Sequence, residues 1–314
     1  MTSRIELNQL YRINNGDWTP CEKLPSAASK LSLFSSQPIS QQSEQFKVLL
    51  AGFKPQTEVF FCSESRNKFV NWHLFGDYQT LVECHASVRD SQFDYLQWPP
   101  GVTQAPRLML FDMDSTFIEI EVIDELARLH QVGDEVAQVT ELAMQGKLDF
   151  AESLVSRVAC LKGLEESAID KVADNLPLSE GVVELVQSGL AADCQTAIVS
   201  GGFTPFVGRL QQQLPLFRVR ANRLKIQAGT LTGEVEGDIV DATAKAEFLQ
   251  ELCDQLEIST DQAIAIGDGA NDLLMMRQAG FSLAYRAKSL VQQQASGRMN
   301  STTLDRLISV FGWS

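Results

Sequence analysis

The prediction of the fold starts from Arg107-Leu108-Met109-Leu110-Phe111-Asp112-Met113-Asp114-Ser115-Thr116. Its first half, residues 107–111, is a short apolar run typical of a buried parallel strand. Asp112 and Asp114 follow where the strand ends, which is where α/β sheets bind their ligands. Side chains two residues apart on an extended chain point the same way, so the carboxylates would repel unless a cation lay between them or one were protonated. The pattern predicts a divalent-metal site in which one carboxylate is a nucleophile and the other carries a proton.

A second acidic turn strengthens this prediction. Residues 263–266 are predicted to form another buried strand, and they lead into Gly267-Asp268-Gly269-Ala270-Asn271-Asp272. The glycines permit a tight turn that would leave Asp268 at the edge of the sheet. Taken alone, residues 112–116 could cap a helix, Asp268 could be a turn residue and Asp272 could interact with a helix dipole. Two acidic strand ends in one parallel sheet favour a hard cation, and Mg²⁺ suits few carboxylates plus phosphate oxygens.

Two further features could hold a phosphate group. Ser200 and Gly201 follow the apolar residues 195–199 and offer a hydroxyl and backbone N–H groups, although an ordinary turn would explain the same residues. Lys245 lies early in a helix expected at about 241–256, where its charge opposes the helix dipole. A solvated surface lysine is the usual explanation, whereas neutralisation of a phosphate would account for the unfavourable position.

The segment between the first acidic pair and Ser200 is predicted to be helical. It interrupts the strand–helix alternation, so we expect an insertion at about 119–188 that caps the site. Arg157 shares the apolar stripe of its helix with Phe150, so its charge is either paired inside the cap or directed into a cavity. Glu121 could simply stabilise a helix N-terminus, or it could join Arg157 in binding the ammonium and carboxylate of an amino acid.

The rest of the chain indicates a second, smaller domain. With 314 residues, the chain is long enough for two domains. Residues 1–98 contain no catalytic motif and are predicted to form a small α+β domain with strands at 47–53 and 58–62. A proline-rich linker at 99–106 leads to the core at 107–314. The first domain could be a packing module, or a regulatory or dimerising one.

Composition narrows the setting and the partners. The net charge of −14 argues against nucleic-acid and anionic-membrane partners. No apolar run approaches the roughly 18 residues of a membrane helix, and the N-terminus lacks the apolar core of a signal peptide. The six cysteines form no C-x-x-C pair, which favours free thiols in a reducing cytoplasm. The three histidines are well separated, so neither a histidine metal site nor a Ser-His triad is expected.

From residue 107 to near the C-terminus, the sequence resembles the phosphoserine phosphatases of the haloacid dehalogenase superfamily. The four signatures of that superfamily occur in order at residues 112–116, residues 199–203, Lys245 and residues 267–272. The cap is similar to that of the phosphoserine enzymes at Ala143, Met144, Gly146, Phe150, Ser153, Leu154, Arg157 and Val158. The resemblance implies an α/β fold with a doubly wound, Rossmann-like parallel sheet and an inserted helical cap. The first hundred residues resemble the divergent, ACT-like leader of bacterial members.

The resemblance also implies a role for each site residue. Asp112 would be the nucleophile and Asp114 the general acid and then base. The ligands of Mg²⁺ would be Asp112, the backbone carbonyl of Asp114, and Asp268, with Asp272 in support. The phosphoryl group would be held by Ser200, Gly201, Lys245 and Asn271. The serine moiety would be bound by Glu121 and Arg157, with Met144 and Phe150 closing over it. The implied reaction is hydrolysis of O-phospho-L-serine through an aspartyl phosphate, the last step of serine biosynthesis.

Other activities share parts of this pattern. A phosphotransferase to another alcohol such as homoserine, or a phosphatase for another small phosphomonoester, would use the same residues. A signalling receiver also has strand-end carboxylates and a lysine but no large helical insertion, and a binding module would hold phosphoserine without releasing phosphate. The complete set of motifs favours the phosphatase. The sequence leaves open the oligomeric state, including a homodimer, and any feedback by serine.

Overall fold

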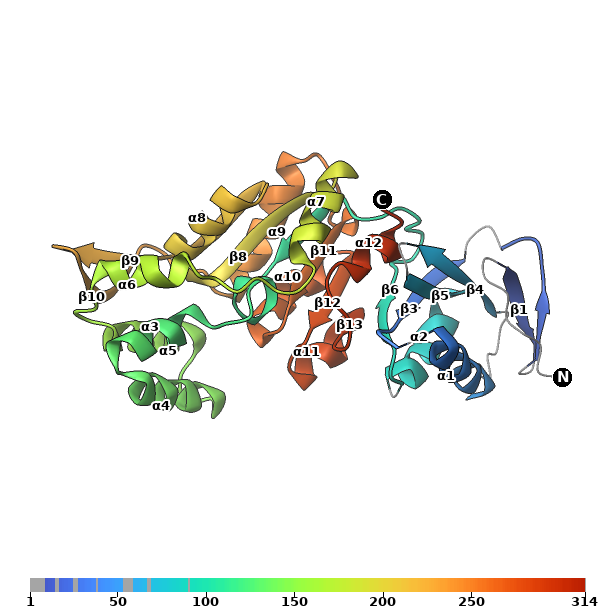
Figure 1. The fold of residues 1–314 in the computed structure, drawn as a ribbon, viewed down its shortest axis with the longest axis horizontal. Coiled ribbons are helices and arrows are strands. Elements are labelled where there is room, and N and C mark those ends of the chain that lie inside the picture. Colours follow the sequence, from blue (N-terminus) through green and yellow to red (C-terminus); the bar gives the residue numbers. More distant parts are fainter. Residues whose placement is uncertain are drawn as a thin grey trace.

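The structure is a computed structural model of the 314-residue chain. It describes residues 9–14, 17–24, 28–37, 39–52, 59–66, 69–89 and 91–313. Within these residues one 13-stranded sheet runs through the whole molecule, in the order β10-β9-β8-β7-β11-β12-β13-β6-β3-β5-β4-β1-β2. Figure 1 shows its N-terminal strands at one end and the helices α3 to α6 near the other. No helix in the described parts of the chain combines the length and apolar character needed to cross a membrane.

Parallel strands form the half of the sheet that carries the predicted motifs, as expected for an α/β fold. They are β7 (Leu108–Phe111), β8 (Gln195–Phe203), β9 (Arg218–Gln227), β11 (Ala263–Gly267), β12 (Phe281–Tyr285) and β13 (Gly297–Met299). The strand β10 (Thr230–Glu236) pairs antiparallel with β9 at the edge. Alternate side chains of β7 enter different cores, with Met109 and Phe111 on one face and Leu108 and Leu110 on the other. The predicted parallel sheet covered on both faces is therefore confirmed.

Helices cover both of these faces. The first core takes apolar residues from α7 (Val182–Ala191), α8 (Thr204–Gln213) and α12 (Arg306–Phe311). The second takes them from α9 (Ala242–Gln255), α10 (Leu273–Gln278) and α11 (Ser289–Gln294). Burial of the strands on both sides explains why their sequences are continuous apolar runs rather than alternating ones.

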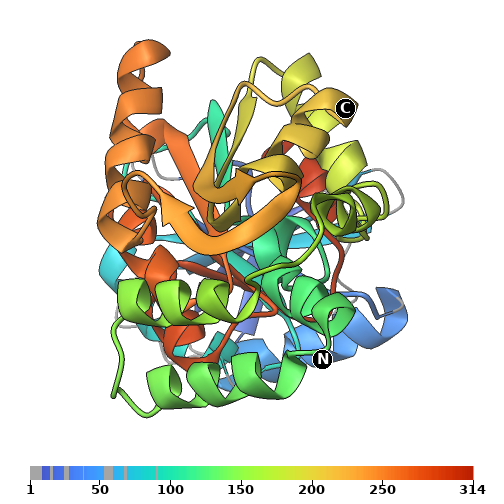
Figure 2. The same ribbon diagram turned by 90° about the vertical axis from the view of Figure 1, so that its left-hand side faces the viewer.

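Four helices between β7 and α7 form a separate group, in which α5 packs on the edge strand β10 and α3 contacts β8. They are α3 (Val122–His130), α4 (Gly133–Met144), α5 (Phe150–Cys160) and α6 (Glu166–Ala173), and Figure 2 views the molecule from their side, with the green helices in front. Two connecting segments join them to the core, held together by the bridge between Ile118 and Leu178 and by the Glu119 N–H donating to the Pro177 carbonyl at 2.9 Å. The α7 helix, which the predicted limits of 119–188 include in part, packs on β8.

The N-terminal part continues the same sheet. Its elements are β1 (Leu10–Asn14), β2 (Asp17–Pro20), β3 (Ser29–Phe34), α1 (Ile39–Gly52), β4 (Val59–Arg66), β5 (Phe69–Gly76), α2 (Tyr78–Arg89) and β6 (Asp94–Gln97). The predicted strand at 47–53 is wrong, because residues 47–52 belong to α1. Phe46, Leu49 and Leu50 are buried whereas Val48 is 75% exposed. This spacing is helical, and the short apolar run was ambiguous between the two structures.

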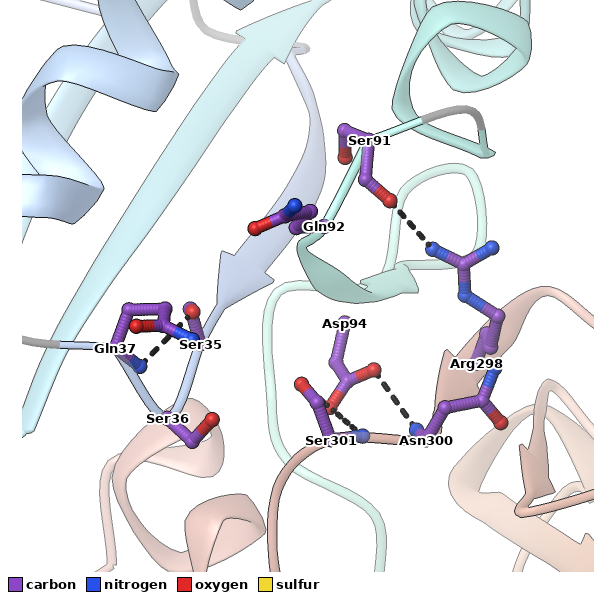
Figure 3. Close-up of a pocket in the computed structure, with 9 residues that line it drawn as sticks. All are labelled: Ser35, Ser36, Gln37, Ser91, Gln92, Asp94, Arg298, Asn300 and Ser301. Atoms are coloured by element: carbon purple, nitrogen blue, oxygen red, sulfur yellow. Dashed lines mark hydrogen bonds between the residues drawn. The ribbon is translucent and has the colours of Figure 1, made fainter.

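The two halves of the sheet join where β6 pairs antiparallel with β13. Asp94 of β6 is 2% exposed at this junction. Its carboxylate accepts bonds of 2.8–3.0 Å from the N–H groups of Asn300, Ser301 and Thr302 and from the hydroxyls of Ser301 and Thr302. Beside it lies a polar pocket of about 370 Å³, shown in Figure 3 and lined by Ser35, Ser36, Gln37, Ser91, Gln92, Asp94, Arg298, Asn300 and Ser301. Arg298 of β13 donates to the carbonyls of Ser91 and Phe93. A charged side chain from each strand, Asp94 from β6 and Arg298 from β13, therefore stabilises the junction.

Candidate active site

The predicted motifs meet at the carboxyl ends of three neighbouring strands. Phe111 of β7 pairs with Ile198 of β8 on one side and with Ile266 of β11 on the other. The Asp112 N–H continues the ladder by donating to the Ile266 carbonyl at 2.8 Å. The parallel register therefore brings together segments that are up to about 150 residues apart in the sequence.

Three acidic side chains and one lysine form the centre of this region. Carboxylate oxygens of Asp112, Asp268 and Asp272 lie within 4.8 Å of one another. The Lys245 Nζ donates to Asp112 Oδ1 and to Asp272 Oδ1, both at 2.7 Å. Asp112, Asp272 and Lys245 are buried. Lys245 thus brings one positive charge against three negative ones, and a set of hard oxygen donors with surplus negative charge suits a divalent cation.

The pKa shifts follow from this imbalance of charge. Burial and the neighbouring Asp272 raise the pKa of Asp112 well above its usual range, against the pull of Lys245. Burial and Asp272 also raise the pKa of Asp268 to about 6. Burial alone would lower the pKa of Lys245, but Asp112 and Asp272 outweigh it and raise the value. The lysine is therefore held as an ammonium, while the carboxylates need further positive charge to ionise together.

Asp114 lies beside this cluster with different partners. Its Oδ1 accepts the Val122 N–H at 2.8 Å, and its Oδ2 accepts the Ser200 hydroxyl at 3.3 Å. Burial, followed by the charge of Glu121, raises the pKa of Asp114 to about 7. A carboxyl group with a pKa near neutrality can both give and take a proton, which is what a general acid and base requires.

Two glycines allow close approach at the end of β8. A Cβ atom on Gly202 would lie 2.6 Å from Asp114 Oδ2, and one on Gly201 would lie 2.7 Å from Phe150 Cζ. Any larger residue would push the carboxylate or the aromatic ring away. The structure thus places Phe150, at the start of α5, directly over the predicted phosphate-binding loop.

The other predicted residues take several positions around the centre. Glu121 accepts the Ser115 hydroxyl at 2.8 Å, and its charge also acts on Asp268. Arg157 is half-buried on α5, where its Nε makes a long 3.4 Å bond to a carbonyl in the preceding turn. Met144 is 80% exposed at the end of α4, so its side chain faces solvent in this conformation.

Asn271 and Ser115 complete the site. Asn271 lies in the short turn Ala270–Asp272, next to the cluster, and is half-buried. Ser115 was not singled out by the sequence, although it fixes Glu121 and adopts a left-handed backbone with φ of 55°. A signal was available, because serine is common at helix caps and turns, but it gave no indication of a bond to Glu121. The roles assigned to these residues stay predictions.

Comparisons with known proteins agree with this geometry. Residues 106–280 match a family model described as haloacid dehalogenase-like hydrolase. Over 197 residues the chain is 49% identical to a phosphoserine phosphatase of Idiomarina loihiensis, covering 63% of this chain and 90% of that protein.

Solved structures extend the likeness to nearly the whole chain. A HAD family hydrolase from Salmonella enterica serovar Typhi superimposes with a TM-score of 0.80 and 30% identity, covering 89% of this chain and 97% of that one. A probable phosphoserine phosphatase from Vibrio cholerae, in unliganded form, gives 0.72 and 34%, covering 90% and 86%. Both superpositions therefore include most of the N-terminal part.

Proposed function

The chain belongs to the haloacid dehalogenase-like hydrolase family, and from this premise we propose that it hydrolyses O-phospho-L-serine to L-serine and phosphate. The observation that supports this most is the meeting of Asp112, Asp268, Asp272 and Lys245 at one end of the sheet. Asp114, with a pKa of about 7, lies beside them. This arrangement combines a nucleophile, a cation site and a proton carrier.

The reaction would proceed in two displacements at phosphorus. A carboxylate oxygen of Asp112 attacks the phosphorus atom, and the bond from phosphorus to the serine oxygen breaks as Asp114 gives that oxygen a proton. Asp114 then takes a proton from water, which attacks the aspartyl phosphate and releases inorganic phosphate. Breaking the hard step into two easier ones is the gain from the covalent intermediate.

A bound Mg²⁺ would supply charge neutralisation for the phosphoryl oxygens and for the acidic cluster. Its protein ligands would be Asp112, the backbone carbonyl of Asp114, and Asp268, while Asp272 holds Lys245. The three acidic groups within 4.8 Å and the excess of negative charge fit such an ion. The same ion and Lys245 would let a protein of net charge −14 bind an anionic substrate.

Substrate recognition divides between core and cap. The phosphoryl oxygens would be bound by Ser200, Gly201, Lys245 and Asn271. The ammonium and carboxylate of serine would be bound by Glu121 and Arg157. Phe150, which already lies over Gly201, would exclude water, and opening at the two connecting segments would admit the substrate. Met144 would have to move inward from its exposed position to close over serine.

The setting follows from the substrate and the thiols. The partner would be a small molecule, and the cysteines whose side chains the structure describes are free thiols, namely Cys21, Cys62, Cys160, Cys194 and Cys253. Free thiols are typical of a reducing compartment, so we place the reaction in the cytoplasm.

The test is a phosphate-release assay on O-phospho-L-serine and a panel of other small phosphomonoesters, with Mg²⁺ and with EDTA. Protein carrying Asp112→Asn, purified in parallel, serves as the blank for contaminating phosphatases. We expect Mg²⁺-dependent release with phosphoserine as the preferred substrate. Preference for another phosphoester, or a new phosphoester on addition of homoserine, would contradict the proposal.

A further inference from the structure

The strands β8 and β9 fall out of register where β8 reaches the site. Val199 pairs with Arg220 and Phe203 pairs with Asn222. Residues 200–202 therefore lie opposite residue 221 alone, which is a bulge in β8. A bulge leaves backbone groups without partners in the ladder, and buried groups of this kind must find partners elsewhere.

The side chain of Asn222 provides a partner for one of these groups, the Gly201 carbonyl, and also binds the backbone at Val240. It is 1% exposed, and both ends of its amide bind backbone groups. The Nδ2 donates to the Gly201 carbonyl at 2.8 Å, and the Oδ1 accepts the Val240 N–H at 2.8 Å. A carbonyl can only accept and an N–H can only donate, so the orientation of the amide is fixed by its neighbours.

One end of this bridge acts on Ser200. The peptide group between Gly201 and Gly202 has its carbonyl held by Asn222, and its N–H donates to Ser200 Oγ at 2.8 Å. The same hydroxyl donates its own hydrogen to Asp114 Oδ2 at 3.3 Å, so Ser200 is held by one accepted and one donated bond. The Asn222 amide thus sets the plane of the peptide that orients the Ser200 hydroxyl.

The other end acts on the helix that carries Lys245. Val240 directly precedes Asp241, whose side chain caps α9 by accepting the Ala244 N–H at 2.9 Å. The Asp241 carbonyl accepts the Lys245 N–H at 3.0 Å. The start of α9, and with it the point from which Lys245 reaches the acidic cluster, is therefore tied to β9 through Asn222.

We propose that Asn222 is a positioning residue that holds the Ser200–Gly202 loop and the Lys245 helix at a fixed separation around the phosphoryl group. This inference rests on the proposed function, because it assumes that phosphorus chemistry takes place between these two segments. It adds a residue whose side-chain bonds go to the backbone of the two segments rather than to the acidic cluster. A shift of about 1 Å in either segment would cost about 10²-fold in rate without a comparable loss of binding.

The test compares Asn222→Ala, which removes both bonds, with Asn222→Asp, which keeps the acceptor for Val240. The matched control is Thr196→Val, which replaces a polar side chain as buried as Asn222 in the same sheet, at the end of β8 far from the bulge. We expect Asn222→Ala to lower kcat about 10²-fold with KM within about threefold. Thr196→Val should leave kcat within about twofold. Thermal unfolding of all proteins gives the folded fraction, by which each rate is divided.

The Asn222→Asp protein supplies a signature that a purely structural role would not give. When protonated, the introduced carboxyl has one donor and one acceptor, as the amide has, and burial raises its pKa. We therefore expect its kcat, divided by that of the parent at each pH, to rise at least tenfold from pH 8 to pH 6. The same ratio for Asn222→Ala should stay flat. A folded Asn222→Ala protein with kcat within threefold of the parent, or a flat ratio for Asn222→Asp, would overturn the inference.

Both O-phosphoserine and p-nitrophenyl phosphate are assayed, so that the two proposals fail separately. A parent that hydrolyses only p-nitrophenyl phosphate would refute the proposed substrate, while the Asn222 variants could still be judged on that ester. A parent active on both esters with fully active Asn222 variants would refute the positioning role alone.

Discussion

Two buried aspartates on the same sheet show two ways of placing a charge inside a protein. Asp94, at the junction of β6 and β13, accepts five bonds from N–H and hydroxyl groups of the facing turn. Asp112, at the end of β7, shares one lysine with Asp272 and lies close to Asp268 as well. The first charge is satisfied by neutral donors, whereas the second lies in a group with more negative charge than its partners balance.

The difference separates a structural carboxylate from a functional one. A buried charge that accepts several bonds from neutral donors contributes to the fold without needing a cation. Like charges held close together lower the stability of the folded protein, and a bound cation offsets this repulsion. We therefore expect substitution of Asp112 to lower activity more than stability, and substitution of Asp94 to lower stability more than activity.

The largest expected effect is that of Asp112→Asn on the rate. An amide is not a nucleophile, so kcat for O-phosphoserine should fall by about 10⁴-fold or more. In EDTA the free energy of unfolding should stay the same or rise, because one of several like charges is removed. Initial rates with Mg²⁺ and urea titration of the metal-free protein test both parts. A fall of more than about 2 kcal/mol in the free energy of unfolding would mean that Asp112 stabilises the fold, as Asp94 is expected to do.

Lys245→Met should lower both the stability of the protein and its kcat. The variant leaves Asp112 and Asp272 buried without their ammonium, which should cost about 3 kcal/mol of stability in EDTA, and kcat should fall by about 10³-fold. Mg²⁺ should raise the Tm of this variant, because binding to the folded state alone stabilises it. Lys171→Met, at an exposed position on α6, is the control. Unchanged stability in EDTA would mean that the buried ion pairs contribute nothing.

Asp94→Ala tests the structural carboxylate. Removing the carboxylate leaves the donors of residues 300–302 without their acceptor, so the free energy of unfolding should fall by about 2–4 kcal/mol. We expect kcat to remain within about threefold, because two further strands, β12 and β11, separate β13 from β7. Asp94→Asn keeps one acceptor oxygen and should lose about half as much. A tenfold fall in kcat in the folded protein would show that the junction acts on the site.

The sequence predicted the site at Asp112 and gave no hint of the role of Asp94, for a physical reason. Residues that follow an apolar strand in a parallel sheet must meet at its carboxyl edge, so local patterns suffice to place Asp112 and Asp268 together. The partners of Asp94 lie more than 200 residues away, and the strand pairing that joins them leaves no local pattern. Asn222 was missed for a similar reason, because its function depends on a bulge in the neighbouring strand.

Local ambiguity explains the error in the N-terminal part. The short apolar run 48–50 fits a buried strand as well as part of a helix that buries Phe46, Leu49 and Leu50 and exposes Val48, and only packing decides between them. The limits of the N-terminal domain, the linker and the cap stay predictions, since the two halves share one sheet. The role of Lys245 is clearer in the structure than in the sequence, because its full burial excludes the solvated lysine that the sequence left open.

The smallest expected effect concerns two arginines of the cap. As with the two aspartates, one is well bonded by its neighbours and the other is not. Arg128 is paired with Glu125 at 2.8 Å on the surface, whereas Arg157 is half-buried with a long bond to the Ser153 carbonyl. If Arg157 binds the substrate carboxylate, Arg157→Ala should lower kcat/KM for O-phosphoserine about 10- to 100-fold, as expected for a charge-assisted hydrogen bond.

The matched substrate is 2-aminoethyl phosphate, which has the ammonium group and lacks the carboxylate, so the same variant should change its kcat/KM by less than about threefold. Arg128→Ala should affect neither substrate by more than about twofold, because an exposed ion pair contributes little. Equal losses on the two esters would mean that Arg157 supports the packing of α5 rather than the carboxylate. The selectivity for phosphoserine would then have to come from Glu121 and the closing of the cap.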